Sequence, residues 1–424
     1  MKKFKYSLFI ILPLVLLVII LFIFFKNSIF NATKDTLSPT NSEISNSSTK
    51  YDIPKIYFLG NISEMLTKED ERKILLRYED GINDFEAYTS IKIQGSSSIA
   101  YEKKNYTIKL YEDYSLTEKK EVDLGWGAQN KYCLKANWID KTHSRNIVTA
   151  QLASEIQKKY NLLSTAPNNG LIDGFPVEIY INDEFLGIYT WNIPKDAWMF
   201  NMDENNKNHI VFVGENWEET VHFKAPATYG PWDIEVGRGD ASDLDKLNRL
   251  IEFVNNSSDD EFKNNYHQYL NLDATINYLI LMEFASLEDN AGKNMLLATY
   301  DGNVWYPSLY DLDTSWGTNY NGLSTINYTR TNFINGSKLW KRTLDNFPEE
   351  VYNRYIELRK DILTKEHIMD LFNEFKNTIP EDSFKKEANR WNNIPGYDYT
   401  QIQDFLDVRI PLMDKFFEKI KINN

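Results

Sequence analysis

Residues 289–317 read DNAGKNMLLATYDGNVWYPSLYDLDTSWG, two β-prone runs set among acidic and amide side chains. The runs cover 294–300 and 303–310. Between them stands Asp301-Gly302, a pair typical of two-residue hairpin turns because both positions tolerate a positive φ. We therefore expect an antiparallel hairpin with Asp301 and Gly302 at its tip.

A two-residue turn would also fix which side chains share a face. It places Asn294 opposite Leu309, and the alternation along each strand then puts four residues on one face, namely Asn294, Leu309, Asp311 and Asp313. Asp289 enters the same corner from the preceding loop. Such a group of oxygen ligands with one further carboxylate suits a hard cation such as Mg²⁺ beside a proton-accepting base.

The composition excludes several classes of site. The chain has 424 residues, enough for two or three domains, and its formal net charge of -14 argues against binding to nucleic acid. The single cysteine, Cys133, excludes a disulfide framework and a cysteine-based zinc site. The five histidines show no His-Glu-x-x-His spacing. The chemistry that remains is that of acidic residues with a metal.

The N-terminus predicts a membrane anchor. A basic flank precedes an uninterrupted apolar run at 8–25 which, at about 1.5 Å per residue, crosses most of a bilayer core of about 30 Å. A signal peptide is the alternative, although its apolar core is usually shorter and no small-residue cleavage site follows here. Residues 1–26 are predicted to anchor the chain with its N-terminus in the cytoplasm and the catalytic part outside, and 27–50, rich in Ser, Thr and Asn, to form a flexible linker.

Two lobes are expected after the linker. Residues 51–195 contain short alternating runs and a hairpin pattern at 176–191, which predict a β-rich lobe that binds nucleotide. Residues 196–424 contain helical patterns at 273–287, with Asp273 as the expected cap, and from 338 onward. The predicted fold class is therefore α+β, with a catalytic, mainly helical second lobe.

A turn of small residues lies between two strand-like runs of the first lobe, 90–94 and 101–110. Glycine permits close backbone approach, and serine hydroxyls and amides donate to oxygens, so the turn and a lysine of the second run suit a phosphate. An ordinary hairpin gives the same local pattern. The turn consists of Gly95, Ser96, Ser97 and Ser98, and the lysines within reach of this sheet are Lys103, Lys104, Lys109 and Lys135.

Residues 140–156 predict a helix with a mostly apolar stripe, capped by Thr142 or Asp140. Its charged residues Arg145 and Glu155 have two interpretations. They form a solvated helix surface, or the helix packs beside the lysine-bearing strand and offers a carboxylate that holds a phosphate-binding lysine.

The order of parts in 289–317 matches that of the catalytic and metal-binding segments of kinases. Asp289 and Asn294 have the spacing Asp-x4-Asn, and a hairpin, an Asp and a Gly follow. In such a site the first Asp accepts the hydroxyl proton, while the Asn and the later Asp hold Mg²⁺ against nucleotide phosphates. Asp289 is thus the predicted base, Asn294 and Asp311 are predicted metal ligands, and Asp313 is a second ligand or a structural partner.

Five blocks in the chain resemble the spore coat protein H (CotH) kinase family. They are GSSS at 95–98, KKNYTIK at 103–109, NWIDKTHSRN at 137–146, VEIYINDEFLGIY at 177–189 and DLDTSWG at 311–317. The resemblance spans about residues 53 to 420. It implies an atypical protein-kinase-like fold that phosphorylates serines of spore coat proteins with ATP and a divalent metal, Mg²⁺ or Mn²⁺.

The resemblance also implies roles for single residues. Asp289 would be the catalytic Asp and Asp311 the metal Asp, with Asn294 and Asp313 close by. The residues assigned to the nucleotide are Gly95, Ser96, Ser97, Ser98, Lys104, Lys109 and Arg145. The chain departs from the family turn Gly-x-Gly-Asn-Ser at Ile93 and Ser96, and it has Leu309-Tyr310 where the family has Pro-Trp.

Three functions are compatible with these patterns. The first is a membrane-anchored kinase that acts on serine or threonine of a coat or envelope protein. The second is a non-catalytic surface adhesin or assembly scaffold with the same fold. The third is a metal-dependent hydrolase that uses the same carboxylates with water as the nucleophile.

Overall fold

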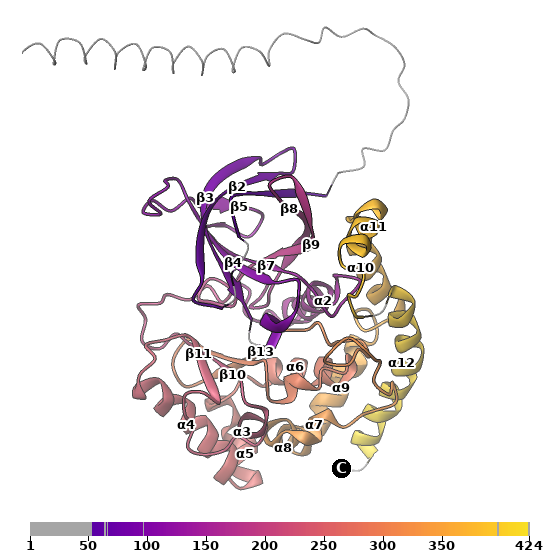
Figure 1. The fold of residues 1–424 in the computed structure, drawn as a ribbon. Coiled ribbons are helices and arrows are strands. Elements are labelled where there is room, and N and C mark those ends of the chain that lie inside the picture. Colours follow the sequence, from indigo (N-terminus) through magenta and orange to yellow (C-terminus); the bar gives the residue numbers. More distant parts are fainter. Residues whose placement is uncertain (1–52, 63–64, 66, 96, 397, 423–424) are drawn as a thin grey trace, which may run out of the picture. The chain divides into compact units, whose positions relative to one another are not determined.

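The computed structural model describes residues 53–422 except 63–64, 66, 96 and 397 (Figure 1). The predicted anchor at 1–26 and linker at 27–50 lie outside these residues. None of the helices in the described part of the chain is long and apolar enough to cross a bilayer.

Seven strands close into a barrel in the order β1-β2-β3-β4-β7-β9-β8. Their bounds are β1 Lys55–Leu59, β2 Glu71–Glu79, β3 Phe85–Gln94, β4 Asn105–Tyr111, β7 Lys131–Lys135, β8 Gly174–Ile181 and β9 Glu184–Asn192. All neighbours are antiparallel except β1 and β8, whose parallel pairing closes the barrel. Alternate apolar residues such as Ile91 and Ile93 fill the interior, while Lys92 between them points outward, as the period of two requires. The predicted β-rich lobe is therefore this barrel.

A second sheet follows in the order β11-β10-β12-β13, with every pair antiparallel. Its strands are β10 Ile210–Gly214, β11 Trp232–Val236, β12 Met295–Thr299 and β13 Trp305–Leu309, and a small pair β5 Val122–Asp123 and β6 Ala128–Gln129 lies apart. The part of the chain after 195 thus contains a sheet as well as helices. The predicted α+β class is confirmed, while the boundary at 195 stays a prediction.

The helices lie around this second sheet, apart from α11, which lies beside the barrel (Figure 1). They are α2 Arg145–Lys159, α3 Trp217–Val221, α4 Ala241–Asn256, α5 Asp259–Asn265, α6 Leu272–Phe284, α7 Phe333–Gly336, α8 Lys338–Asn346, α9 Pro348–Leu358, α10 Lys365–Asn377, α11 Glu381–Arg390 and α12 Tyr399–Ile422. Short 3-10 turns are η1 Ser97–Ala100, η2 Tyr266–Gln268 and η3 Asp289–Ala291. The cap of α6 is Asn271, whose side chain accepts from the amide of Ala274, so the prediction that Asp273 caps this helix is wrong.

The barrel and the helices interlock through two elements. Helix α2 follows β7 in the chain, yet it packs against α6 and α10, and its apolar residues belong to the hydrophobic core of the second sheet. Helix α11 comes late in the chain, yet it packs against β9 of the barrel (Figure 1). Each part of the fold therefore carries a helix whose neighbours belong to the other.

The hairpin of β12 and β13 forms as predicted, but in another register. Met295, and not Asn294, lies opposite Leu309, and Thr299 lies opposite Trp305. The connection runs from 300 to 304 because the carboxylate of Asp301 accepts from the backbone amides of the next residues and closes a wider loop. The predicted two-residue turn and the face derived from it are therefore wrong.

A buried ion pair joins α11 to the barrel. The ammonium of Lys103, just before β4, donates to Glu387 Oε1 at 2.6 Å and to the carbonyls of Ala136 and Ile188, and Glu387 Oε2 accepts from the amide of Ile188 at 2.7 Å. Burial lowers the pKa of Lys103, and the Glu387 carboxylate opposes that shift. Gly187 makes room, since a Cβ there would lie 2.7 Å from Lys103 Cε. The pair therefore forms only when β9, α11 and the residues beside β4 and β7 are all in place.

Glu387→Ala should lower the free energy of unfolding by about 3 to 5 kcal/mol, because it leaves a buried ammonium without its counter-charge. Urea unfolding of the full chain, followed by tryptophan fluorescence, measures the loss. Glu381→Ala on the same helix is the control, since that side chain is 86% exposed, and we expect a change within about 0.5 kcal/mol. Equal stabilities of the two variants would contradict the role of the pair.

Candidate functional site

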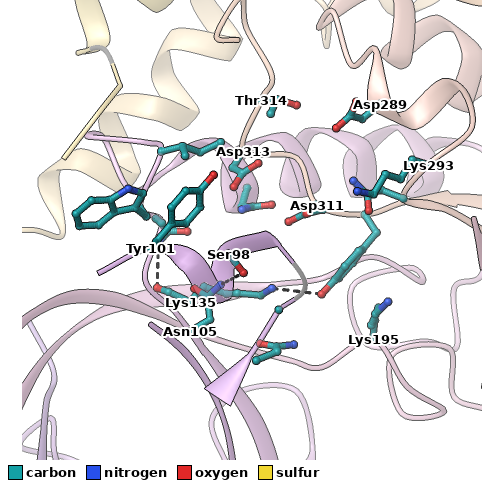
Figure 2. Close-up of a pocket in the computed structure, with 18 of the residues that line it drawn as sticks. Ser98, Tyr101, Asn105, Lys135, Lys195, Asp289, Lys293, Asp311, Asp313 and Thr314 are labelled. Carbon is teal, nitrogen blue, oxygen red and sulfur yellow. Dashed lines mark hydrogen bonds between the residues drawn. The ribbon is translucent and has the colours of Figure 1, made fainter. Parts of the chain in front are cut away.

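A cavity of about 780 Å³ lies where the edge of the barrel meets the second sheet (Figure 2). Carboxylates from around β12 and β13 lie along one side, and Lys135 from the end of β7 faces them from the barrel. The described residues with charged or amide side chains that line it include Gln94, Asn105, Lys135, Asn137, Lys195, Asp289, Lys293, Asn294, Asp311 and Asp313.

The four predicted acidic and amide residues all line this cavity, namely Asp289, Asn294, Asp311 and Asp313. Asp289 opens the short turn η3 after α6. Asn294 and Asp311 lie just outside the two paired strands, and both have left-handed backbones with φ of 59° and 56°. The strand ends therefore bring them together, and not a shared strand face. The predicted grouping is correct although its register argument is not.

Backbone hydrogen bonds hold these residues in position. The amide of Asn294 donates to the carbonyl of Gly214 at 2.8 Å. The side chain of Asn290 donates to the carbonyl of Tyr310 at 2.9 Å and to that of Asn294 at 3.4 Å. On the other side of Asp311, the amide of Leu312 donates to Asn146 Oδ1 on α2 at 2.7 Å. The left-handed residues are thus fixed by partners on both sides.

The carboxylates share an acidic environment. Burial raises the pKa of Asp289, and the charges of Asp311 and Glu288 add to the rise, while Lys293 opposes it. Burial also raises the pKa of Asp313 well above its usual range, with the Asp311 carboxylate as the next cause. The Asp311 carboxylate thus disfavours ionisation of Asp289 and Asp313, and a cation placed among these groups would be stabilised.

The opposite side carries cations. Lys135 Nζ lies 3.4 Å from the hydroxyl of Tyr310. Burial lowers the pKa of Lys135, but Tyr310 and Asp311 raise it by more, so it stays an ammonium. Lys195 lies over the same tyrosine ring at 5.0 Å and pairs with Glu235. Among the described residues no carboxylate lies within 4.0 Å of Lys135 Nζ, so this ammonium is available to a ligand in the cavity.

The turn of small residues borders the cavity through Gly95 and Ser98. Gly95 has a φ of 119°, and a Cβ there would lie 1.9 Å from Ser98 Oγ, so the turn requires glycine. Ser98 Oγ accepts from Asn105 Nδ2 at 3.3 Å. Ser96 and the side chain of Ser97 lie outside the described residues.

Lys104 and Lys109 are not among the described residues that line the cavity. Lys104 Nζ donates to the carbonyls of Ile99 and Tyr101, so it holds the chain after the turn. Lys109 projects from the outer surface of β4 into a second depression. Of the four lysines that the sequence leaves open, the one that faces the carboxylates is Lys135, and Lys293 from the loop before β12 also lines the cavity.

Arg145 is likewise not among the described residues that line the cavity. It is fully buried, forms an ion pair with Asp140 and donates to Gln401 Oε1 at 2.7 Å. The N-cap of α2 is Ser144, and not Thr142 or Asp140 as predicted, although the other oxygen of Asp140 accepts from the amide of Arg145 at 2.9 Å. The interpretation of Arg145 as part of a solvated helix surface is wrong.

An aromatic rim that the sequence analysis does not identify completes the site. Tyr101 and Trp138 line the cavity and stack with ring centroids 6.0 Å apart, and Trp391 meets Trp138 edge-on at 5.9 Å. Stacked rings of this kind suit a flat ligand group. A sequence signal exists for two of them, since Trp138 lies within the block at 137–146 and Tyr101 lies between the blocks at 95–98 and 103–109.

The oxygen donors of the cavity are of the kind that a hard divalent cation requires. Nowhere in the described part of the chain do three or more Asp, Glu, His or Cys side chains surround one point suited to a metal. Asp311, Asp313 and the Asn294 amide are oxygen donors of the kind that Mg²⁺ and Mn²⁺ prefer, and Mg²⁺ is commonly held by one or two carboxylates together with phosphates and water. The residues present fit such an ion.

Comparison with known proteins identifies the family. A family model described as CotH kinase protein matches residues 91–412. A search of curated proteins gives no match. The matched region covers well over half of the 424 residues and contains Asp289, Asn294, Lys135, Asp311 and Asp313. The resemblance of the five blocks is thereby confirmed, and the chain belongs to the CotH kinase family.

Proposed function

We propose that this chain is a membrane-anchored protein kinase that transfers the γ-phosphoryl group of ATP to a serine or threonine of a spore coat or cell-envelope protein. The observation that carries the proposal is the placement of Asp289, Asn294, Asp311 and Asp313 in one cavity with Lys135 facing them. The barrel and the second sheet with its helices then correspond to the two lobes of an atypical kinase-like fold. The apolar run at 8–25 supports the anchor.

Asp289 is the proposed general base. It is half-buried, lines the cavity and has a raised pKa, which suits a carboxylate that accepts a proton from a hydroxyl. Glu288 beside it pairs with Arg330 and points elsewhere. Asp289 is therefore the carboxylate left for the acceptor.

Asn294, Asp311 and Asp313 are the residues that would hold Mg²⁺ or Mn²⁺. When bound, the ion would neutralise the phosphate oxygens of ATP. Asp311 and Asp313 supply the negative charge. Asn294, just before the neighbouring strand β12, adds a neutral oxygen.

Lys135 is the proposed phosphate-binding cation. Its ammonium faces Asp311 across the cavity, as Figure 2 shows, and its raised pKa keeps it charged. The turn at Gly95 and Ser98 would cover the nucleotide from the barrel side, since both residues border the same space. The aromatic rim of Tyr101 and Trp138 offers a flat surface for the base.

Asp289→Asn and Asp311→Asn should each reduce phosphate transfer from ATP by about 10²- to 10⁴-fold, because one removes the base and the other a metal ligand. Transfer of radiolabel from ATP to a serine-containing acceptor measures the effect. Asp260→Asn, an exposed position on α5, is the matched control and should label as the wild type does. Equal labelling by all four proteins would refute the kinase assignment.

Lys135→Met should weaken ATP binding by about 10- to 100-fold, because a charge-assisted hydrogen bond contributes about 1.5 to 3 kcal/mol. Lys109→Met should leave ATP affinity unchanged, because Lys109 projects from the outside of the barrel. Titration calorimetry with ATP and Mg²⁺ measures both. A larger loss for Lys109→Met would return the phosphate contact to the lysine that the resemblance implies.

ATP with Mg²⁺ should stabilise the protein. At a ligand concentration of about 100 times Kd, the free energy of unfolding should rise by about 2.7 kcal/mol. A thermal melt with and without the ligands provides the measurement, with ATP plus EDTA as the control. A non-catalytic scaffold with the same fold predicts no shift.

A further inference from the structure

A second depression, which we name the basic groove, lies on the outside of the barrel. It encloses about 330 Å³ and crosses β2, β3, β4 and β7. Its lining consists of Lys68, Glu71, Ser90, Lys92, Ile93, Thr107, Lys109 and Lys131. Lys68 and Ile93 also line the cavity of the candidate site. The basic groove is therefore continuous with that cavity.

The lysines of the basic groove repel one another. Lys109 on β4 lies directly opposite Lys131 on β7 in the strand register. Side chains so placed have Cβ atoms about 4.5 to 5.5 Å apart, and like charges in this position destabilise a sheet. Lys92 projects from the adjacent strand β3, and Lys68 reaches in from the loop before β2. An anionic partner would relieve this repulsion.

Carboxylates neutralise the groove only in part. Lys131 pairs with Asp196 at 2.8 Å, and Lys92 pairs with Glu71 at 3.5 Å through side chains that are almost half exposed. Within the described part of the chain, Lys68 and Lys109 form no ion pair at 4.0 Å or less. The protein as a whole has a formal net charge of -14. The groove is thus a local excess of positive charge on an acidic protein.

The groove leads toward Lys135. Tyr132 and Leu134 of β7 point into the barrel, so Lys131 and Lys135 both point outward. Four residues of strand separate them by about 13 Å. An extended peptide rises about 3.3 Å per residue, so a segment held in the groove reaches Lys135 after about four residues.

We propose that the basic groove binds an acidic segment of the protein acceptor, a stretch of Asp or Glu about four or more residues away from the phosphorylated hydroxyl. This inference rests on the proposed kinase function. A groove that is concave and opens into the cavity fits an extended chain better than a flat lipid surface. Lys109, one of the two lysines that the family resemblance assigns to ATP, would then bind the acceptor.

Binding of a fluorescein-labelled peptide with six consecutive glutamates tests the proposal. Anisotropy is measured with the full chain in nonionic detergent, without ATP, against a peptide in which glutamine replaces every glutamate. The wild type should bind the glutamate peptide at least about ten-fold more tightly at low salt, and NaCl should reduce the difference. The double variant Lys92→Glu with Lys109→Glu should lose the preference.

Lys360→Glu with Lys419→Glu is the control of equal charge, because both lysines are exposed on the helical part, and it should retain the preference. Equal affinities for the two peptides, or equal losses in both double variants, would overturn the proposal. Binding of glycerol phosphate, measured by titration calorimetry, without any binding of the glutamate peptide would assign the groove to a lipid head group and also overturn the proposal.

Phosphate transfer to serine peptides with glutamate or glutamine flanks separates this proposal from the proposed function. A KM at least about ten-fold lower for the glutamate flank, lost in the groove variant, would support both. Transfer with equal KM values would overturn the acceptor role of the groove alone. Absence of transfer to either peptide would contradict the kinase assignment and with it the acceptor role, whereas the affinity of the groove is decided by the anisotropy.

Discussion

A buried hydrogen-bond network between α2 and the segment 311–317 determines the geometry of the site. Asn146 accepts from the amide of Leu312 at 2.7 Å, and Thr149 accepts from the indole of Trp316 at 2.8 Å. Arg145 acts through Gln401, whose amide donates to the carbonyl of Trp316 at 2.9 Å. All these side chains are buried, so loss of one partner would leave a polar group without water or a replacement. The two sequence blocks at 137–146 and 311–317 are thus halves of one structure.

This network explains how a loop can hold unusual backbone conformations. Asp311 has a positive φ, as does Trp316, and neither is glycine. Such conformations cost free energy and persist only where their surroundings over-determine them. Helix α2 supplies that support through Asn146. Helix α11 is held to the barrel by the ion pair of Glu387 with Lys103. Polar contacts thus help to position both sides of the cavity.

Much of the fold and part of the candidate site could be predicted from the sequence, for reasons that differ between residues. Strand alternation predicts the β-rich lobe and the hairpin pattern at 176–191, which the structure has as the antiparallel pair β8 and β9. The two-residue turn predicted from Asp301-Gly302 does not form, because the carboxylate of Asp301 closes a wider loop. Arg145 and Lys104 do not line the cavity, because their charges satisfy backbone and side-chain partners that no local pattern reveals, so their assignment to the nucleotide stays a prediction. Asp289, Asn294, Asp311 and Asp313 were grouped correctly because family motif order is independent of register.

The electrostatics of the cavity limit the form in which a nucleotide enters. Asp311 raises the pKa of Asp313 on its own side and that of Lys135 on the other, so its charge acts on both. Lys135 and Lys293 line the cavity together with three carboxylates, Asp289, Asp311 and Asp313, and the phosphates of the proposed nucleotide would add further negative charge there. Like charges that are close together and partly buried repel one another strongly. We therefore expect the proposed nucleotide to bind as a complex with a divalent cation.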